Sequence, residues 1–395
     1  MLELYSYVNG EARPGGRVGE DLNPAHPSEV LAIVHLADAR LVAEAVESSR
    51  QAFVGWRKMT SPARGEILRI AGDLLDQRAD LIGRDLTREE GKTLAEGIGE
   101  TKRAASILRY YAGQALEPDG ETYPSHSPVT FLYSRREPVG VVVAITPWNF
   151  PIAIPAWKIA PALVYGNSVV WKPAEIVPLT AMHLLQALID AGLPRGVVNL
   201  VLGKGSEIGD VLATHELVDA ISFTGSNPVG RSLQLKAVQQ GKKVQLEMGG
   251  KNPAVVLADA DIDLAVEHVA RGAFLSAGQK CTATSRVIVE EAVLSAFQER
   301  LVDVARAWRV GDPLESATRV GPLASSEQMD KVLGYVERGR GEGGQALAGG
   351  ERKATDGYYV PPTVLGGVDA RSPVAREEIF GPVAVLLAAS SYDEA

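Results

Sequence analysis

The single cysteine of the chain, Cys281, lies in the stretch Ser276-Ala-Gly-Gln-Lys-Cys281-Thr-Ala-Thr. A lone cysteine forms no internal disulfide, so it is either an inert packing residue or a reactive thiol. Gly278 lets the main chain approach a neighbour closely, while Gln279 and Lys280 are poor core residues. Small polar residues follow, so the sequence places this thiol in a loop. A cysteine in such a position can serve as a nucleophile in its thiolate form.

Glycines that follow predicted strands and open helices are a second chemical signal, because such turns bind dinucleotides. The usual G-x-G-x-x-G pattern after the first strand is missing. Instead, Gly203-Lys-Gly205 follows the third predicted strand of the sheet and Gly225-Ser-Asn-Pro-Val-Gly230 the fourth. Main-chain N–H groups of a helix that opens at Ser226 could hold a phosphate. The glycines taken alone fit an ordinary tight turn equally well.

Composition excludes several classes of function. Apolar residues make up 46% of the 395 residues, which is ordinary for a globular protein with a large core. The net charge is −9, and no run of five basic residues indicates a nucleic-acid partner. The most apolar run, Val139 to Pro147, is too short for a membrane helix. The start of the chain lacks the pattern of a signal peptide, and with a single cysteine this favours the cytoplasm.

The first 115 residues predict short strands and then helices. Residues 1 to 37 are expected to form strands and turns, and Asp38 to Trp56 a helix with Asp38 as N-cap. Ser61-Pro62 predicts the next helix start, with Ser61 as its cap and Pro62 at the first helical position. Further helices are expected to extend to about Gln114, with breaks at three glycines. The charged side chains of residues 64–84 are expected on a solvated surface. The three glycines are Gly91, Gly97 and Gly99.

Residues 116–137 carry turn signals and the β-branched and aromatic run Val129–Tyr133, which predicts a strand. We expect a protruding hairpin that pairs with another subunit.

From Gly140 onward, strands and helices alternate, which predicts an α/β fold with doubly wound sheets. Ligands of such sheets bind beyond the carboxyl ends of the strands, where several of the polar residues considered below occur. A second α/β unit starts after Met248-Gly-Gly250, with a glycine-rich surface loop expected at 341–357. The strands of the first unit are predicted at Val141–Thr146, Ser168–Lys172, Val198–Val201, Ala220–Thr224, Lys243–Met248 and Ala254–Leu257.

Six motifs occur in one order, and together they are far more specific than any glycine pattern. The chain resembles the NAD(P)-dependent aldehyde dehydrogenase superfamily from its first strand to its last residue. The motifs are Thr146-Pro-Trp-Asn-Phe-Pro151, Lys172-Pro-Ala-Glu175, Phe223-Thr-Gly-Ser226, Glu247-Met-Gly-Gly-Lys251, Gly278-Gln-Lys-Cys281 and Glu378-Ile-Phe-Gly-Pro382.

The resemblance implies four catalytic residues. Cys281 would attack the aldehyde carbon and later carry the acyl group as a thioester. The side-chain amide of Asn149 and the main-chain N–H of Cys281 would stabilise the oxyanion. Glu247 would activate the water that hydrolyses the thioester. Lys158 would lie near the oxyanion. From its position alone, Glu247 is also compatible with a carboxylate that caps a nearby main-chain group.

The resemblance also implies the cofactor, NAD or NADP. A carboxylate at Glu175 would accept from the ribose hydroxyls and repel a 2′-phosphate, so it favours NAD, while Lys172 leaves dual use open. Phe150 and Trp157 would line the substrate tunnel, although both fit ordinary core positions. The histidine spacing indicates no metal site. The implied cofactor-binding residues are Thr146, Trp148, Lys172, Glu175, Gly205, Gly225, Ser226, Glu378 and Phe380.

Several stretches most resemble the 2,5-dioxopentanoate (α-ketoglutarate semialdehyde) dehydrogenases, so a small anionic semialdehyde is the expected substrate. A succinate-semialdehyde or broad-specificity aldehyde dehydrogenase is the alternative, and so is a cofactor-binding relative without activity. An acyltransferase that uses coenzyme A is disfavoured by Glu247. The stretches are Arg109-Tyr-Tyr-Ala-Gly113, Pro155-Ala-Trp-Lys158, Pro161-Ala-Leu-Val-Tyr165, Gln245-Leu-Glu-Met-Gly249 and Gln279-Lys-Cys-Thr-Ala-Thr-Ser-Arg286.

The expected domains are a dinucleotide-binding domain of 1–115 and 138–248, an oligomerisation hairpin of 116–137, and a catalytic domain of 249–395. Members of the family usually continue beyond the Glu-Ile-Phe-Gly-Pro motif, so the catalytic domain is expected to be incomplete at its C-terminal end. A homodimer or homotetramer is expected if the missing segment is not required.

Overall fold

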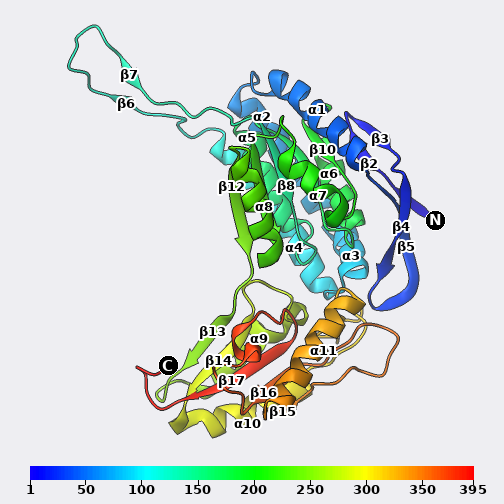
Figure 1. Ribbon diagram of the computed structural model, residues 1–395, viewed down its shortest axis with the longest axis vertical. Helices are drawn as coiled ribbons and strands as arrows, with labels where there is room; N and C mark the ends of the chain where they lie inside the picture. The colour runs from blue at the N-terminus through cyan, green and yellow to red at the C-terminus, as the bar shows by residue number, and fades with distance from the viewer. The chain divides into compact units, whose positions relative to one another are not determined.

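The computed structural model describes all 395 residues, and the chain folds into two compact units (Figure 1). Unit 1 comprises Met1–Asp21, Leu31–Ile82 and Ile98–Glu247. Unit 2 comprises Leu22–Val30, Gly83–Gly97 and Met248–Ala395. Each unit is built around a sheet with helices packed on it, which confirms the predicted α/β class. No helix is long and apolar enough to cross a membrane.

The seven-stranded sheet of unit 1 has the order β12-β11-β8-β9-β10-β2-β3. Neighbours among β11, β8, β9 and β10 pair in parallel, so their carboxyl ends meet at one edge of the sheet. Every residue of β8 and β9 is buried, as expected for strands covered on both faces. The strands are β2 (Ser6–Val8), β3 (Glu11–Arg13), β8 (Val141–Ile145), β9 (Ser168–Lys172), β10 (Val198–Leu200), β11 (Ala220–Gly225) and β12 (Lys243–Met248).

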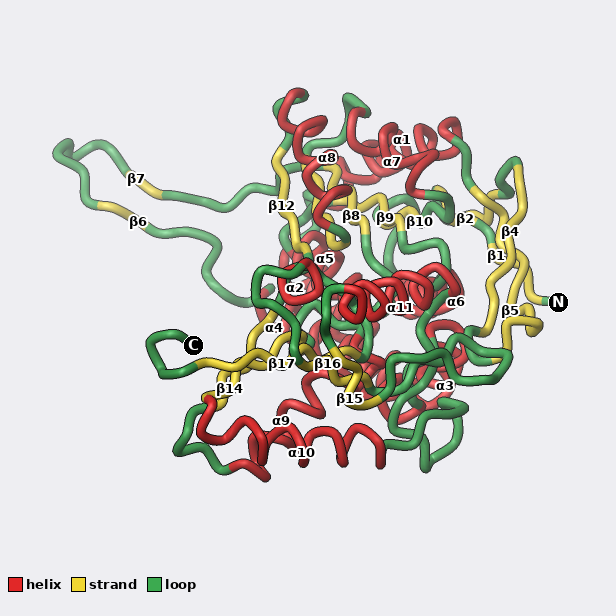
Figure 2. Tube along the Cα trace, turned by 60° about the horizontal axis from the view of Figure 1, so that its bottom comes forward, coloured by secondary structure: helices red, strands yellow, loops and turns green.

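Helices cover both faces of this sheet (Figure 2). Helices α1, α7 and α8 lie on one face, and α2, α5 and α6 lie on the other. Helices α1 and α2 lie close to their predicted positions. The helices are α1 (Ala39–Trp56), α2 (Ser61–Gln77), α5 (Ala153–Val164), α6 (Pro178–Asp190), α7 (Gly205–Thr214) and α8 (Asn227–Gln239).

The start of α1 confirms the predicted N-cap, because the Asp38 carboxylate accepts a hydrogen bond from the main-chain N of Leu41 at 2.9 Å. The start of α2 is shifted by one residue from the prediction: Thr60 is its N-cap, and Pro62 lies within the first turn.

Two helices, α3 (Ala79–Glu90) and α4 (Leu94–Gln114), follow α2. The break expected at Gly91 is present, whereas Gly97 and Gly99 lie inside α4, so those two expected breaks are wrong. The reason at Gly97 is packing: a Cβ there would lie 2.5 Å from the carbonyl oxygen of Gly83 on α3. The glycine therefore allows the two helices to approach closely instead of ending one of them.

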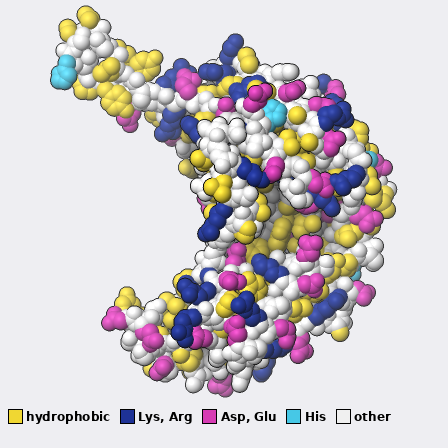
Figure 3. Space-filling view, viewed as in Figure 1, with side chains coloured by type: hydrophobic (Ala, Val, Ile, Leu, Met, Phe, Trp, Pro, Cys, Tyr) yellow, Lys and Arg dark blue, Asp and Glu magenta, His cyan; other side chains and the backbone are white.

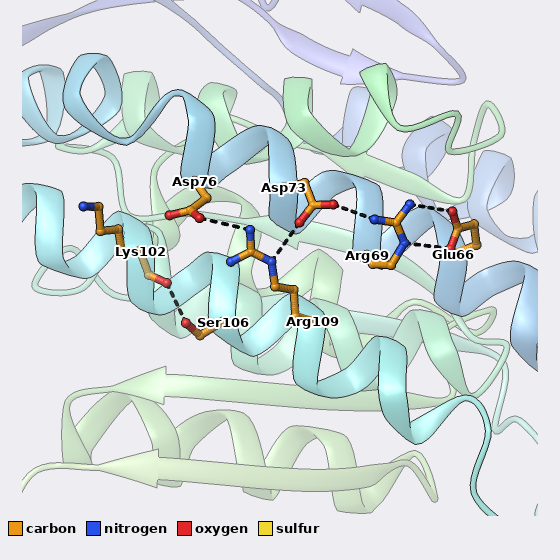
Figure 4. A network of polar contacts seen from close by, with 7 residues as sticks. All are labelled: Glu66, Arg69, Asp73, Asp76, Lys102, Ser106 and Arg109. Carbon is orange, nitrogen blue, oxygen red and sulfur yellow. Dashed lines mark hydrogen bonds and ion pairs between the residues drawn. The ribbon is translucent and has the colours of Figure 1, made fainter.

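Charged side chains join α2 to α4 on the surface of unit 1 (Figure 4). Arg109 on α4 donates to Asp73 at 2.8 Å and to Asp76 at 3.0 Å, both on α2. These groups are partly solvated, as predicted, and such pairs contribute little to stability. Arg64 was expected among them and is instead buried. Its Nε donates to the carbonyl of Val164 at 2.9 Å and so satisfies the C-terminal end of α5.

Two small sheets accompany the large one. The first has the order β1-β5-β4, and the second is a two-stranded antiparallel hairpin within 116–137 that stands away from the rest of unit 1. The hairpin strands are shorter than predicted, because only the last two residues of Val129–Tyr133 are paired. The strands are β1 (Leu2–Leu4), β4 (Arg17–Asn23), β5 (His26–Leu36), β6 (Thr122–Tyr123) and β7 (Leu132–Tyr133).

The sheet of unit 2 has the order β13-β14-β17-β16-β15, with parallel pairing except between β15 and β16. Helices α9 and α10 cover one face and α11 lies on the other. The elements are β13 (Asn252–Val256), α9 (Ile262–Phe274), β14 (Thr284–Glu290), α10 (Glu291–Ala307), α11 (Ser326–Gly341), β15 (Gln345–Ala348), β16 (Thr363–Gly366), α12 (Pro373–Arg376) and β17 (Val383–Ala389).

The prediction of a loop throughout 341–357 is wrong, because β15 lies within it. Glycines on both sides hide this short edge strand in the sequence. The strand Ala254–Leu257 predicted with the first unit is part of β13 and belongs to the unit 2 sheet.

A buried carboxylate fixes the start of α5, the helix that follows the Asn149 loop. Glu100 Oε1 accepts hydrogen bonds from the main-chain N atoms of Ile152 at 3.0 Å and Ala153 at 3.1 Å. Glu100 is 5% exposed, so these bonds form away from water. The carboxylate therefore satisfies two amide groups that the first turn of a helix leaves without partners.

We predict that Glu100→Ala lowers the free energy of unfolding by about 2–4 kcal/mol, because two buried donors lose a charged acceptor. Glu100→Gln should cost roughly half as much, since its carbonyl oxygen can still accept. Urea unfolding monitored by circular dichroism measures both changes. Equal stability of the wild type and Glu100→Ala would contradict this account.

Candidate active site

The predicted site residues lie on both units. In unit 1, Asn149 lies on the loop between β8 and α5. Thr146 begins this loop: its main-chain N donates to the carbonyl of Lys172 at 3.0 Å, and its Oγ1 accepts from Trp171 Nε1 at 2.9 Å. Asn149 is buried and Trp148 half-buried. The loop is therefore held against β9 by hydrogen bonds to both its main chain and its first side chain.

The two tunnel candidates differ in exposure. Phe150 is half-buried, whereas the side chain of Trp157 on α5 is 45% exposed. Trp157 is therefore not a core residue of unit 1.

Lys158 and Glu247 are connected through Gln245. Lys158 Nζ donates to Ser222 Oγ at 2.9 Å and to Gln245 Oε1 at 3.2 Å, and Gln245 Nε2 donates to Glu247 Oε1 at 2.9 Å. Burial lowers the pKa of Lys158 to about 8, and the nearby Glu247 carboxylate partly opposes this shift. Lys158 can only donate, so the amide of Gln245 must present its oxygen to Lys158 and its N–H to Glu247.

Three predicted cofactor residues meet at the carboxyl ends of β9 and β10. Glu175 is exposed and accepts a hydrogen bond from the main-chain N of Gly205, the first residue of α7, at 3.2 Å. Lys172 is buried, and burial lowers its pKa although the Glu175 carboxylate opposes the shift. A Cβ at Gly205 would lie 3.9 Å from Lys172 Nζ and 4.0 Å from Glu175 Oε1. A side chain at position 205 would therefore start in van der Waals contact with both of these groups.

The glycine turn after β11 leads directly into α8. Gly225 ends the strand, and Ser226 is the N-cap residue of the helix, followed by a proline in its first turn. The side chain of Ser226 is exposed and makes no capping hydrogen bond. The N-terminal end of a helix can bind an anion, which is the role predicted here for a phosphate.

In unit 2, Cys281 is exposed and follows a strained turn. Ser276, Ala277 and Gly278 have φ angles of 55°, 51° and 68°, which is unusual for the two residues with side chains. Asn252 Nδ2 donates to the carbonyl of Cys281 at 2.6 Å. Hydrogen bonds from β13 therefore hold the nucleophile candidate at its main chain.

The later motif lies against the same loop. A Cβ at Gly278 would overlap the carbonyl oxygen of Gly381, and one at Gly249 would overlap the carboxylate of Glu378. Burial raises the pKa of Glu378, while Lys331, the main-chain N–H of Gly250 and Lys251 oppose the shift. Unit 2 thus brings the Cys281 loop next to the segment that carries Glu378 and Phe380.

Phe380 has a positive φ of 60°, which is strained for an aromatic residue. Gln328 Nε2 donates to its carbonyl oxygen at 2.7 Å and supports this conformation.

Three side chains at these positions were not singled out from the sequence. They are Glu96, which holds Ser276, Asn252, which holds Cys281, and Gln245, which holds Glu247. A sequence signal exists for Glu96 alone, because Thr93-Leu-Ala-Glu96 matches a helix capping box. Gln245 occurs in a matched stretch but had no assigned role, and nothing local marks Asn252.

The chain is similar to known aldehyde dehydrogenases in sequence and in fold. The profile of the Aldehyde dehydrogenase family matches residues 12–395. The chain is 45% identical to an alpha-ketoglutaric semialdehyde dehydrogenase of Bacillus subtilis, covering 99% of this chain and 81% of that protein. It is 44% identical to an alpha-ketoglutarate semialdehyde dehydrogenase of Haloferax volcanii, covering 98% and 82% respectively. It is 42% identical to a 2,5-dioxopentanoate dehydrogenase of Saccharolobus solfataricus, covering 95% and 79%.

The fold is also that of a solved enzyme. A betaine aldehyde dehydrogenase from Staphylococcus aureus, crystallised in complex with NAD+, superposes with a TM-score of 0.97 at 34% identity. The match covers 100% of this chain and 79% of that one. These findings confirm the predicted fold and the predicted NAD(P)-dependent aldehyde dehydrogenase activity. The chain belongs to the aldehyde dehydrogenase family.

Proposed function

We propose that this enzyme oxidises 2,5-dioxopentanoate, the semialdehyde of 2-oxoglutarate, to the dicarboxylate with NAD(P). The observation that carries the choice of substrate is that three relatives with this activity in their names are 42–45% identical over 95–99% of the chain. Succinate semialdehyde has the same terminal aldehyde and a carboxylate, and it is the competing substrate.

The proposed chemistry assigns one step to each catalytic residue. The Cys281 thiolate attacks the aldehyde carbon, and the resulting oxyanion accepts hydrogen bonds from Asn149 and the Cys281 main-chain N–H. Loss of hydride leaves a thioester on Cys281. Glu247 takes a proton from water, which then hydrolyses the thioester. The exposure of the Cys281 thiol and of the Glu247 carboxylate supports roles that require contact with substrate and water.

The residues of unit 1 fit NAD(P), which accepts the hydride when it is bound. Glu175 can accept hydrogen bonds from ribose hydroxyls, and Lys172 can donate one. The N-terminal end of α8, with Ser226, can bind the pyrophosphate. The exposed carboxylate of Glu175 favours NAD over NADP, since a 2′-phosphate would be repelled. In unit 2, Glu378 and Phe380 are assigned to the nicotinamide ribose and ring.

This proposal divides the chain into a cofactor-binding part, residues 1–115 and 138–248, and a catalytic part from residue 249. The hairpin of 116–137 is assigned to pairing between subunits of a homodimer or homotetramer. Its apolar side chains gather on the arm in Figure 3, and Val129 and Phe131 are 92% and 73% exposed. Such exposure is typical of a surface that a partner covers. The single cysteine is compatible with a cytoplasmic location.

The substrate assignment predicts a ranking of aldehydes. Formation of reduced cofactor should give at least a tenfold larger kcat/KM with 2,5-dioxopentanoate than with succinate semialdehyde, a difference of about 1.4 kcal/mol in transition-state binding. The same assay with NAD and NADP should favour NAD. A larger kcat/KM for succinate semialdehyde would move the enzyme to the competing branch, and a folded chain inactive with both would contradict the proposal.

Cys281→Ser should lower kcat by at least ~1000-fold, because the hydroxyl of serine is a much weaker nucleophile than a thiolate. The binding of NAD to the variant, measured by calorimetry, should stay within about twofold of the wild type. The variant also lacks every thiol, so labelling with iodoacetamide should disappear completely. Retained oxidation would remove Cys281 from the mechanism.

Glu247→Gln should block hydrolysis more than acylation. We expect a burst of reduced cofactor close to one equivalent per active site, followed by a steady rate about 100–10,000-fold below that of the wild type. Stopped-flow absorbance measures both phases. Gln245→Leu is the matched comparison, because it leaves the carboxylate in place and removes the amide that donates to Glu247 and accepts from Lys158. Steady turnover of Glu247→Gln at the wild-type rate would exclude Glu247 as the base.

A further inference from the structure

The turn in front of Cys281 is held in an unfavourable conformation. Ser276, Ala277 and Gly278 all lie in the left-handed region of backbone space, and the first two have side chains that disfavour it. Ser276 and Ala277 are also buried. Successive strained residues persist only where surrounding groups determine the conformation. Some interaction must therefore hold this turn in place. The turn matters for the site because it leads directly into the Cys281 loop.

The carboxylate of Glu96 holds it with a full set of hydrogen bonds. Its Oε1 accepts from the main-chain N of Ser276 at 2.8 Å and from the Ser276 hydroxyl at 2.9 Å. Its Oε2 accepts from the main-chain N of Thr93 at 3.0 Å and from the Thr93 hydroxyl at 2.8 Å. Each oxygen thus binds one donor pair, and hydrogen bonds to an ionised acceptor are stronger than neutral ones.

The Thr93 pair explains why Glu96 is so well oriented. Thr93 precedes α4, and Glu96 reaches back to its main-chain N–H, which is the carboxylate half of a helix capping box. A capping box needs one oxygen of the glutamate for this purpose. The second oxygen is bound to a residue 180 positions later in the chain, so its contact serves the Cys281 loop and not the helix.

Neutral amides contact other parts of the loop. Gln279 Oε1 accepts from the main-chain N of Ala324 at 3.0 Å, and Asn252 Nδ2 donates to the carbonyl oxygens of Cys281 at 2.6 Å and Ala283 at 3.1 Å. Among these contacts, the one to Glu96 alone involves a charged group and acts on the strained residues themselves.

We propose that Glu96 is a positioning residue for the nucleophile: it fixes the left-handed turn Ser276–Gly278 and thereby the place of the Cys281 thiol. The role rests on the proposed function of Cys281. In this role Glu96 does not contact the reacting atoms and acts only through the position of the thiol. Its loss should therefore reduce kcat, and the binding of the cofactor should stay unchanged.

The decisive variant is Glu96→Gln, which keeps the shape of the side chain. A carboxamide accepts at one end only, so either the Thr93 pair or the Ser276 pair must face an NH2 group. Glu290→Gln is the matched control in unit 2, because Glu290 also accepts from a main-chain N–H, that of Ala258, and lies at the far end of β14 from Cys281. Ser276→Ala is a milder variant, because it removes only the hydroxyl that donates to Glu96. It takes the place of Glu96→Gln in the test if Glu96→Gln does not fold.

Two measurements test the proposal. Hydrogen–deuterium exchange of the amides of 276–281 should be at least about tenfold faster in Glu96→Gln, and kcat should fall at least about tenfold while KM for NAD stays within about twofold. Ser276→Ala should show smaller changes in the same direction. Glu290→Gln should match the wild type in both measurements.

The outcomes separate this proposal from the function on which it rests. Unchanged exchange in Glu96→Gln, or faster exchange with an unchanged kcat, would overturn the role of Glu96. A parallel rise in KM for NAD would also overturn it, since it would indicate general damage to the enzyme. Exchange does not depend on turnover, so a wild type that oxidises neither semialdehyde would contradict the proposed function without deciding the question of the turn.

Discussion

The site loops depend on one constraint: main-chain N–H groups at helix starts and turns need hydrogen-bond acceptors. In a doubly wound sheet, helices start at the same edge where the site loops lie, so such donors are concentrated there. The chain satisfies many of them with carboxylates. Glu100 binds the start of α5 after the Asn149 loop, and Glu96 binds the turn before Cys281. Because buried donors without partners are costly, these carboxylates restrict the loops to one conformation.

Much of the fold could be predicted because its signals are local. The buried run Ser168–Lys172 is a strand with the predicted bounds, and the N-cap at Asp38 marks α1 correctly. The failures come from contacts between distant segments. Gly97 looks like a helix break in the sequence, and only the neighbouring Gly83 explains why a glycine is needed inside α4. Strand β15 was missed because it is a short edge strand flanked by glycines, and its pairing partner lies 21 residues further along the chain in the register Gln345↔Gly366.

The sequence predicts the residues of the candidate site that lie in its motifs. It does not predict the residues that hold the site loops in place. Each motif residue occurs in a contiguous pattern, so a single sequence reveals it. The residues that orient them act across long separations: Glu96 on Ser276, and Asn252 on Cys281. No periodicity or spacing encodes such a pair. The capping-box pattern at Thr93 predicts that one carboxylate oxygen of Glu96 binds the start of its own helix. It does not predict the partner of the other oxygen.

Two of the buried lysines of unit 1 are Lys158 on α5 and Lys172 at the end of β9, and an exposed carboxylate lies near each of them. Burial lowers the pKa of Lys158 and of Lys172, while Glu247 and Glu175 respectively oppose the shift. Each lysine can donate hydrogen bonds, and the nearby carboxylate is not bound to it in a direct ion pair. At Glu247 the connection passes through the amide of Gln245, which leaves the second carboxylate oxygen available to water. The arrangement suits a general base better than a direct ion pair would, because a carboxylate bound tightly to an ammonium is a weaker base.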